Sequence, residues 1–161
     1  MTRKVLLLAF IPALLSGLSA CERPAGQAAP PARLVTMSET GLDTLQIERG
    51  RQVYVKHCQT CHGVEGKGQA GDWRQRKPNG LYPPPPLDDT AHAWHHPTEV
   101  LRQAIKSGSP PDMGDMPAWE GKLAGTEIED VIVYIKSLWS KETYQQWLEI
   151  ERNATEYAAE Q

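Results

Sequence analysis

The feature that most constrains this 161-residue chain is the placement of two cysteines and a histidine within five positions, CQTCH at residues 58–62. Two residues separate Cys58 from Cys61, and His62 follows directly. This is the C-x-x-C-H spacing at which haem is attached. One helical turn sets two thiols beneath the two vinyl groups of one porphyrin and directs the next imidazole toward iron. The motif predicts covalent haem on Cys58 and Cys61, with His62 as an axial ligand.

Two other readings of the same cysteines are disfavoured. A redox-active dithiol needs C-x-x-C within a strand–helix–strand pattern, and no convincing strand pattern surrounds residue 58. A structural zinc site needs four ligands, and the chain has no second cysteine pair to add to His57 and the motif.

The residues around the motif extend the match. Gly50, Tyr54 and Gly63 give the order glycine, three residues, aromatic, three residues, C-x-x-C-H-G. In this the segment resembles class I cytochromes c. The resemblance implies an all-α fold, with three core helices around one covalently bound haem c. We expect a first helix capped by Asp43 or Thr44, in which Gly50 permits close approach of another helix.

A second helix is predicted near the end of the haem domain. Thr126 and Glu129 have capping-box spacing, and apolar residues follow at helical intervals: Ile128, Val131, Ile132, Ile135, Leu138 and Trp139. By the same resemblance this helix crosses the first one at Gly50, with Val131 and Tyr134 nearby. A short helix is expected over residues 99–107, ended by Gly108.

The sixth iron ligand is expected in the segment 112–119, DMGDMPAW. The resemblance implies a distal methionine directly before a proline, which Met116 and Pro117 fit. Met113 is the main alternative, and the histidines His92, His95 and His96 are another. A His/Met pair suits an electron carrier, because a thioether ligand raises the reduction potential.

Residues 63–97 are predicted to form a loop that wraps the haem. The resemblance implies that a proline carbonyl there accepts a hydrogen bond from His62, and Pro85 and Pro86 both remain candidates. The run Pro83 to Pro86 has an alternative reading as a polyproline II docking segment.

Two polar clusters in this loop keep more than one reading. Arg74, Arg76 and Lys77 either pair with haem propionates, dock an acidic partner or form a solvated surface. The histidines at 92, 95 and 96 either bind copper, bond a propionate or form an exposed turn.

The N-terminus has the pattern of an export signal. Arg3 and Lys4 precede an apolar run over residues 5–15, and residues 18–21, LSAC, resemble the bacterial lipoprotein box. This implies cleavage before Cys21 and its lipidation. We therefore expect a signal peptide at 1–20, a flexible tether at 21–41, a haem domain at 42–140 and a helical extension at 141–161. Without lipidation the protein would be soluble in the periplasm.

The function expected from these features is one-electron transfer by a periplasmic, lipid-anchored monohaem cytochrome c. A formal charge of −3 argues against nucleic-acid binding. Redox proteins of a respiratory chain are the expected partners, with a terminal oxidase as one candidate acceptor. The alternative is a haem enzyme or sensor whose sixth ligand is displaceable.

Overall fold

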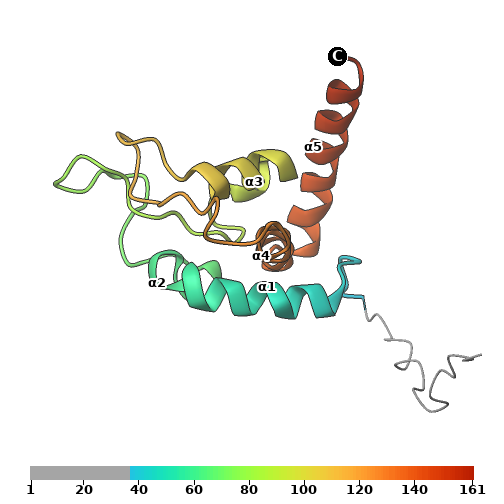
Figure 1. Ribbon diagram of the computed structural model, residues 1–161, viewed down its shortest axis with the longest axis horizontal. Helices are drawn as coiled ribbons and strands as arrows, with labels where there is room; N and C mark the ends of the chain where they lie inside the picture. Colours follow the sequence, from blue (N-terminus) through green and yellow to red (C-terminus); the bar gives the residue numbers. More distant parts are fainter. Residues whose placement is uncertain (1–36) are drawn as a thin grey trace, which may run out of the picture. The chain divides into compact units, whose positions relative to one another are not determined.

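The computed structural model describes residues 37–161, and within that range the chain forms α-helices and short 3-10 turns without a β-strand (Figure 1). The helices are α1 (Thr44–His57), α2 (Gln59–His62), α3 (Thr98–Ser107), α4 (Gly125–Ser137) and α5 (Lys141–Ala159). The turns are η1 (Val64–Gly66) and η2 (Ala93–His95). The predicted all-α fold, with three core helices and an additional C-terminal helix, is confirmed.

The predicted signal peptide, the lipidation site Cys21 and most of the tether lie outside the described residues. Among the helices of residues 37–161, none has the length and apolar character needed to cross a membrane.

The helices α1 and α4 cross at Gly50, and Figure 1 shows α4 nearly end-on against α1. Asp43, and not Thr44, caps α1, since its carboxylate accepts from the Leu45 N–H at 2.9 Å. On α4, Tyr134 packs on the fully buried Tyr54, with 5.0 Å between ring centroids. Backbone contact at the glycine thus brings the two aromatic rings together.

The predicted capping box at Thr126 and Glu129 is wrong. The helix begins at Gly125, and the carboxylate of Glu127 accepts the N–H of Ala124 at 2.8 Å. The carboxylate of Glu129 instead accepts a hydrogen bond from the guanidinium of Arg102 on α3, with 3.0 Å between Nη2 and Oε2. The carboxylate proposed as a cap therefore joins α3 to α4.

The helix α5 is separate from α4 and is capped by Ser140, whose hydroxyl accepts from the Thr143 N–H at 3.2 Å. In its first half the buried Trp147 packs against Trp139, and the buried Tyr144 packs against Trp147. Its second half extends away from the other helices (Figure 1). The indole of Trp147 donates to the carbonyl of His96 at 3.1 Å, so α5 braces the segment that precedes α3.

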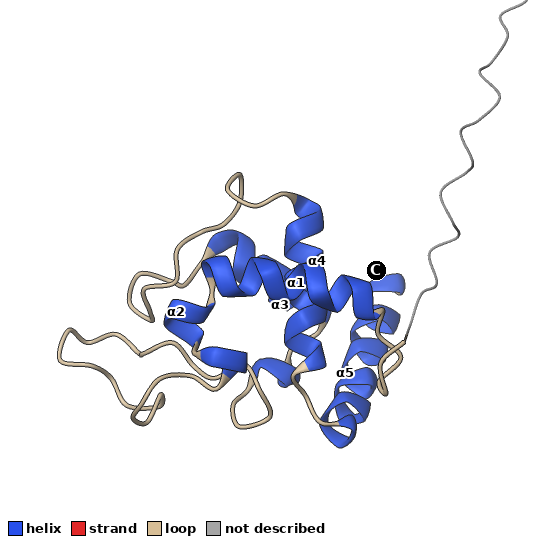
Figure 2. Ribbon diagram, turned by 90° about the horizontal axis from the view of Figure 1, so that it is seen from below, coloured by secondary structure: helices blue, strands red, loops and turns tan. Residues whose placement is uncertain are grey.

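The long loop between α2 and α3 is fixed at both ends. Gly63, at φ +79°, starts it, and a Cβ there would lie 2.1 Å from the carbonyl oxygen of Gly68. Near its far end the Trp139 indole donates to the carbonyl of Leu87 at 2.9 Å. The loop is thereby held over one side of the helical core, and Figure 2 shows the helices arranged around a central region.

Candidate haem site

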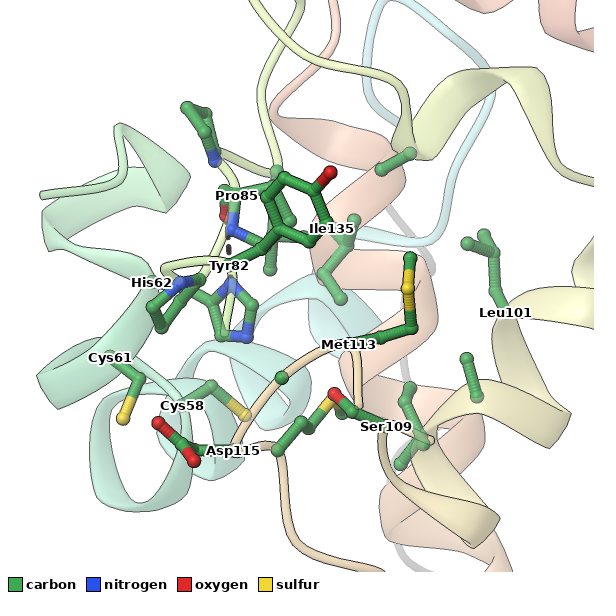
Figure 3. A pocket seen from close by; sticks show the side chains of 18 of the residues that line it. Cys58, Cys61, His62, Tyr82, Pro85, Leu101, Ser109, Met113, Asp115 and Ile135 are labelled. Carbon is green, nitrogen blue, oxygen red and sulfur yellow. Dashed lines mark hydrogen bonds between the residues drawn. The ribbon is translucent and has the colours of Figure 1, made fainter. Parts of the chain in front are cut away.

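A cavity of about 730 Å³ lies between the helices, the loop over residues 63–97 and the loop over residues 108–124 (Figure 3). Ligand pockets in proteins commonly measure about 300–1,000 Å³. Apolar side chains from α3, α4 and the loops form most of its wall: Leu87, Leu101, Ile105, Leu123, Val131 and Ile135. Such a wall excludes water and leaves few polar groups to interact with a ligand.

The C-x-x-C-H motif lies on this cavity. Cys58 joins α1 to α2, and its carbonyl accepts from the His62 N–H at 2.9 Å, which closes one helical turn. Cys58, Cys61 and His62 all line the cavity, and Figure 3 shows them together at one side of it. Both cysteines are free thiols, and burial raises the pKa of the Cys58 thiol to about 11. The predicted attachment residues therefore lie on one short helix beside a space large enough for a cofactor.

The imidazole of His62 is buried and oriented by the proline run. Its Nδ1 lies 2.9 Å from the carbonyl oxygen of Pro85, the partner that the structure selects from Pro85 and Pro86. Because a carbonyl can only accept, Nδ1 holds the proton and Nε2 holds the lone pair. Burial lowers the pKa of His62, which favours this neutral form. His62 is thus prepared to bind a metal through Nε2.

Tyr54 also stabilises the turn that contains His62. Its hydroxyl donates to the carbonyl of Gly63 at 2.7 Å, directly after the histidine. The sequence identified Tyr54 as the aromatic position that precedes the cysteines, and this contact adds a role in fixing the start of the loop.

Met113 and Met116 both line the cavity, and Figure 3 shows Met113 across it from the cysteines. The carbonyl of Met116 accepts from Ser109 N–H at 3.0 Å, close to the end of α3. The carbonyl of Met113 accepts from Tyr82 N–H at 2.9 Å. Met116 is half-buried and packs against the hydrophobic core, whereas Met113 is 44% exposed. The structure brings both candidate sulfur ligands to the site and anchors them to different elements.

The residues present fit covalently bound haem. They supply two thiols one helical turn apart, a buried neutral imidazole with its lone pair free, thioether sulfur and an apolar enclosure. Cys58 and Cys61 would form the thioether links and His62 would bind the iron. The fold and this site together define a c-type cytochrome.

Comparison with known proteins identifies the family. The family described as "Cytochrome C oxidase, cbb3-type, subunit III" matches residues 45–135, more than half of the chain, and this chain belongs to it. The attached haem c that characterises cytochromes c supplies one-electron redox chemistry.

Its relatives include "Cbb3-type cytochrome c oxidase subunit FixP" of Bradyrhizobium sp. (strain ORS 278), 30% identical over 116 residues, which cover 67% of this chain and 36% of the relative. "Cbb3-type cytochrome c oxidase subunit FixPc" of Rhizobium leguminosarum bv. viciae is 29% identical over 103 residues, 64% of this chain and 30% of the relative. The subunit named CcoP of Azospirillum brasilense is 26% identical over 105 residues, 65% and 32% of the two chains. The chain spans about a third of the length of these relatives.

The side chains of His92, His95 and His96 do not gather into a metal site. The rings of His92 and His96 lie 5.5 Å apart, while His95 packs against Trp94 with 3.9 Å between centroids. In the described part of the chain, no three His, Cys, Asp or Glu side chains are grouped so that they could hold a metal ion. His92 stacks on Trp73 at 5.0 Å, and His92 and His96 line the cavity. His92 and His96 therefore belong to the wall of the cavity.

The cations of the basic stretch have partners within the chain. Arg74 pairs with Asp72 at 3.7 Å, and Lys77 pairs with Asp115 at 2.6 Å. Arg76 donates to the carbonyl of Asp112 at 2.9 Å. Sequence reasoning missed the distant partners of Arg76 and Lys77, because no local spacing relates positions more than 30 residues apart. It also missed Tyr82, Ser109 and Asp115 as cavity residues.

Proposed function

We propose that this protein carries single electrons between partners of a respiratory chain, as a cytochrome c with one haem and no catalytic turnover of its own. The sequence contains one C-x-x-C-H motif, and its remaining cysteine, Cys21, lies far from it. In this proposal Cys58 and Cys61 hold the haem, and His62 and Met116 are the axial ligands.

The observation that carries the proposal is the contact of His62 Nδ1 with the Pro85 carbonyl at 2.9 Å, at the edge of an apolar cavity that also contains methionine sulfur. The contact fixes the imidazole in one tautomer and one orientation. A histidine on one side and a thioether on the other would leave no open position for substrate. That arrangement favours a carrier over the alternative of a haem enzyme or sensor.

The proposed location is the periplasmic side of a bacterial membrane. It rests on the export pattern of residues 1–20 and on Cys21, which lipidation would make an anchor. Residues 21–41 would serve as the tether, residues 42–140 as the haem domain and residues 141–161 as an extension. A tether rich in Pro, Ala and Gly gives a small domain the reach to meet partners near the membrane.

The proposed electron acceptor is a terminal oxidase of the cbb3 type. The support is that the matched relatives carry the name of subunits of such an oxidase. Oxidation of the reduced protein by a purified cbb3-type oxidase, followed by stopped-flow absorption, tests this partner. Oxidation no faster than in air-saturated buffer alone would argue against it.

The central experiment is an absorption spectrum of the full chain, exported in a host that attaches c-type haem. Spectra of the oxidised, reduced and CO-treated reduced protein separate the candidate functions. A low-spin haem that shows the Met–Fe(III) charge-transfer band and no CO shift supports the carrier. A five-coordinate or readily CO-binding haem would favour the enzyme or sensor and would remove Met116 as ligand.

A further inference from the structure

Two loops that lie far apart in the sequence are joined beside the cavity. Residues 76–82, here called the clamp segment, contact residues 112–115 through three pairs. Tyr82 N–H donates to the Met113 carbonyl at 2.9 Å, Arg76 Nη1 donates to the Asp112 carbonyl at 2.9 Å, and Lys77 Nζ lies 2.6 Å from Asp115 Oδ2. The three contacts are made by Asp112, Met113 and Asp115, which belong to the loop that carries both candidate methionine ligands.

The clamp segment is ordered by its own contacts. The guanidinium of Arg76 lies over the Tyr82 ring, 4.3 Å from its centroid, and also donates to the carbonyl of Gly80. The backbone N–H of Lys77 donates to the carbonyl of Leu81 at 2.8 Å, and the N–H of Gly80 donates to the carbonyl of Lys77 at 2.8 Å. A tight turn thus presents Arg76, Lys77 and Tyr82 together toward the neighbouring loop.

The clamped loop forms part of the cavity wall. Tyr82, Met113 and Asp115 all line the cavity, and Figure 3 shows them around it. The loop is also tied to itself, by the bond from Ser109 N–H, just after α3, to the Met116 carbonyl. Residues 112–115 therefore lie between this bond and the contacts of the clamp segment.

We infer that the clamp segment closes the cavity on the methionine side, and that Arg76 and Lys77 are positioning residues that restrict access of small external ligands to the haem iron. This inference rests on the proposed function, because it assumes a haem whose sixth position faces the methionine loop. It also assigns a role to two cations of the basic stretch, Arg76 and Lys77, which hold a neighbouring loop. The individual contacts are exposed, so each contributes modestly.

The test compares the haem-loaded full chain with the Arg76→Ala/Lys77→Ala double variant. Arg51→Ala is the matched control, because Arg51 is a half-exposed arginine paired with Glu48 on α1. Hydrogen exchange is followed in peptides covering residues 80–84 and 110–117, together with CO uptake by the reduced protein. We expect about tenfold faster exchange in the double variant, about threefold faster exchange in each single variant and no change in the control. The reduced double variant should bind CO, whereas the parent protein and the control should not. Lys77→Arg retains the ion pair and should behave as the parent protein.

The outcomes separate this inference from the proposed function. Unchanged exchange in the double variant overturns the clamp, whatever the ligands of the iron. Faster exchange with unchanged CO uptake overturns its role in restricting access. If the parent protein already binds CO fully and lacks the Met–Fe(III) band, the proposed function fails, and the exchange data still decide whether the loops are clamped.

Discussion

A Cβ placed on Gly50 would lie 1.9 Å from the carbonyl oxygen of Asp130. The same atom would lie 2.8 Å from the Cβ of Tyr134, so α1 and α4 meet with backbone against backbone. Arg49 reinforces the crossing, because its Nε lies 2.8 Å from the Asp130 carboxylate. Residue 50 therefore has to lack a side chain for the helices to pack at this distance.

We expect Gly50→Ala to lower the free energy of unfolding of the haem-loaded protein by about 3 kcal/mol, because the methyl group forces the helices apart. Urea unfolding followed by circular dichroism measures the change. Gly125→Ala is the control, since Gly125 is also helical and a Cβ there has nothing within 4 Å. It should alter stability by no more than about 1 kcal/mol, in the stabilising direction. Equal losses in the two variants would contradict the role of the crossing.

Lys136 is a buried cation on α4. Its Nζ donates to the Thr98 hydroxyl at 2.7 Å and lies 4.0 Å from the centroid of the Trp147 ring. Burial lowers the pKa of Lys136 to about 8, against the opposing effect of the Glu151 and Glu129 carboxylates, while the Arg102 cation lowers it further. Residues of α3, α4 and α5 thus surround one titratable group.

This burial predicts a specific pH dependence. Between about pH 8 and pH 10.5 the unfolded chain binds a proton at Lys136 that the folded chain has lost, so the free energy of unfolding rises with pH. Below pH 8 both states are protonated and the cost of burying the charge is constant. Lys136→Met should therefore be more stable than the parent below pH 8, by at most about 3 kcal/mol, and this advantage should shrink toward pH 10.5.

Urea unfolding of both proteins at pH 6 to 10 measures this difference. Burial also raises the pKa of Tyr54, Tyr134 and Tyr144, which lowers stability near pH 10 in both proteins. The comparison between parent and variant removes that contribution. A difference that stays constant over the whole range would show that Lys136 does not titrate in this window.

Much of the site was predictable because its signals are local. The spacing of Cys58, Cys61 and His62 follows from one helical turn, and the order of Gly50 and Tyr54 follows from the face of α1. These patterns depend on residues at most four positions apart. The same locality accounts for the prediction of all four longer helices.

The remaining features depend on contacts between distant residues. The choice of Pro85 over Pro86 is set by where the loop meets His62, which no spacing encodes. The expected cap at Glu129 was wrong because Arg102, 27 positions away, binds that carboxylate. Similarly, the ion pair between Lys77 and Asp115 forms only where the two loops lie beside each other in the folded chain.

The extension α5 is expected to stabilise the haem pocket through Trp147. Trp147→Phe keeps the aromatic ring but removes the indole N–H that donates to the His96 carbonyl, so we expect a loss of about 1 kcal/mol. Thermal unfolding measures the loss, and hydrogen exchange in residues 92–98 should increase. Tyr157→Phe is the control on the same helix, because Tyr157 is 67% exposed, and it should leave both measurements unchanged. If α5 does not brace this segment, the two variants will behave alike.

The two cavity methionines are expected to differ in their effect on the iron. The Met116 backbone is tied to Ser109 at the end of α3 and its side chain packs on the core, whereas Met113 is 44% exposed. Met116→Ala should therefore abolish the Met–Fe(III) charge-transfer band and allow the reduced protein to bind CO. Met113→Ala should retain the band, as should Met37→Ala, a control at an exposed methionine outside the cavity. A band that persists in the Met116 variant and disappears in the Met113 variant would assign the ligand to Met113, the residue held by Tyr82.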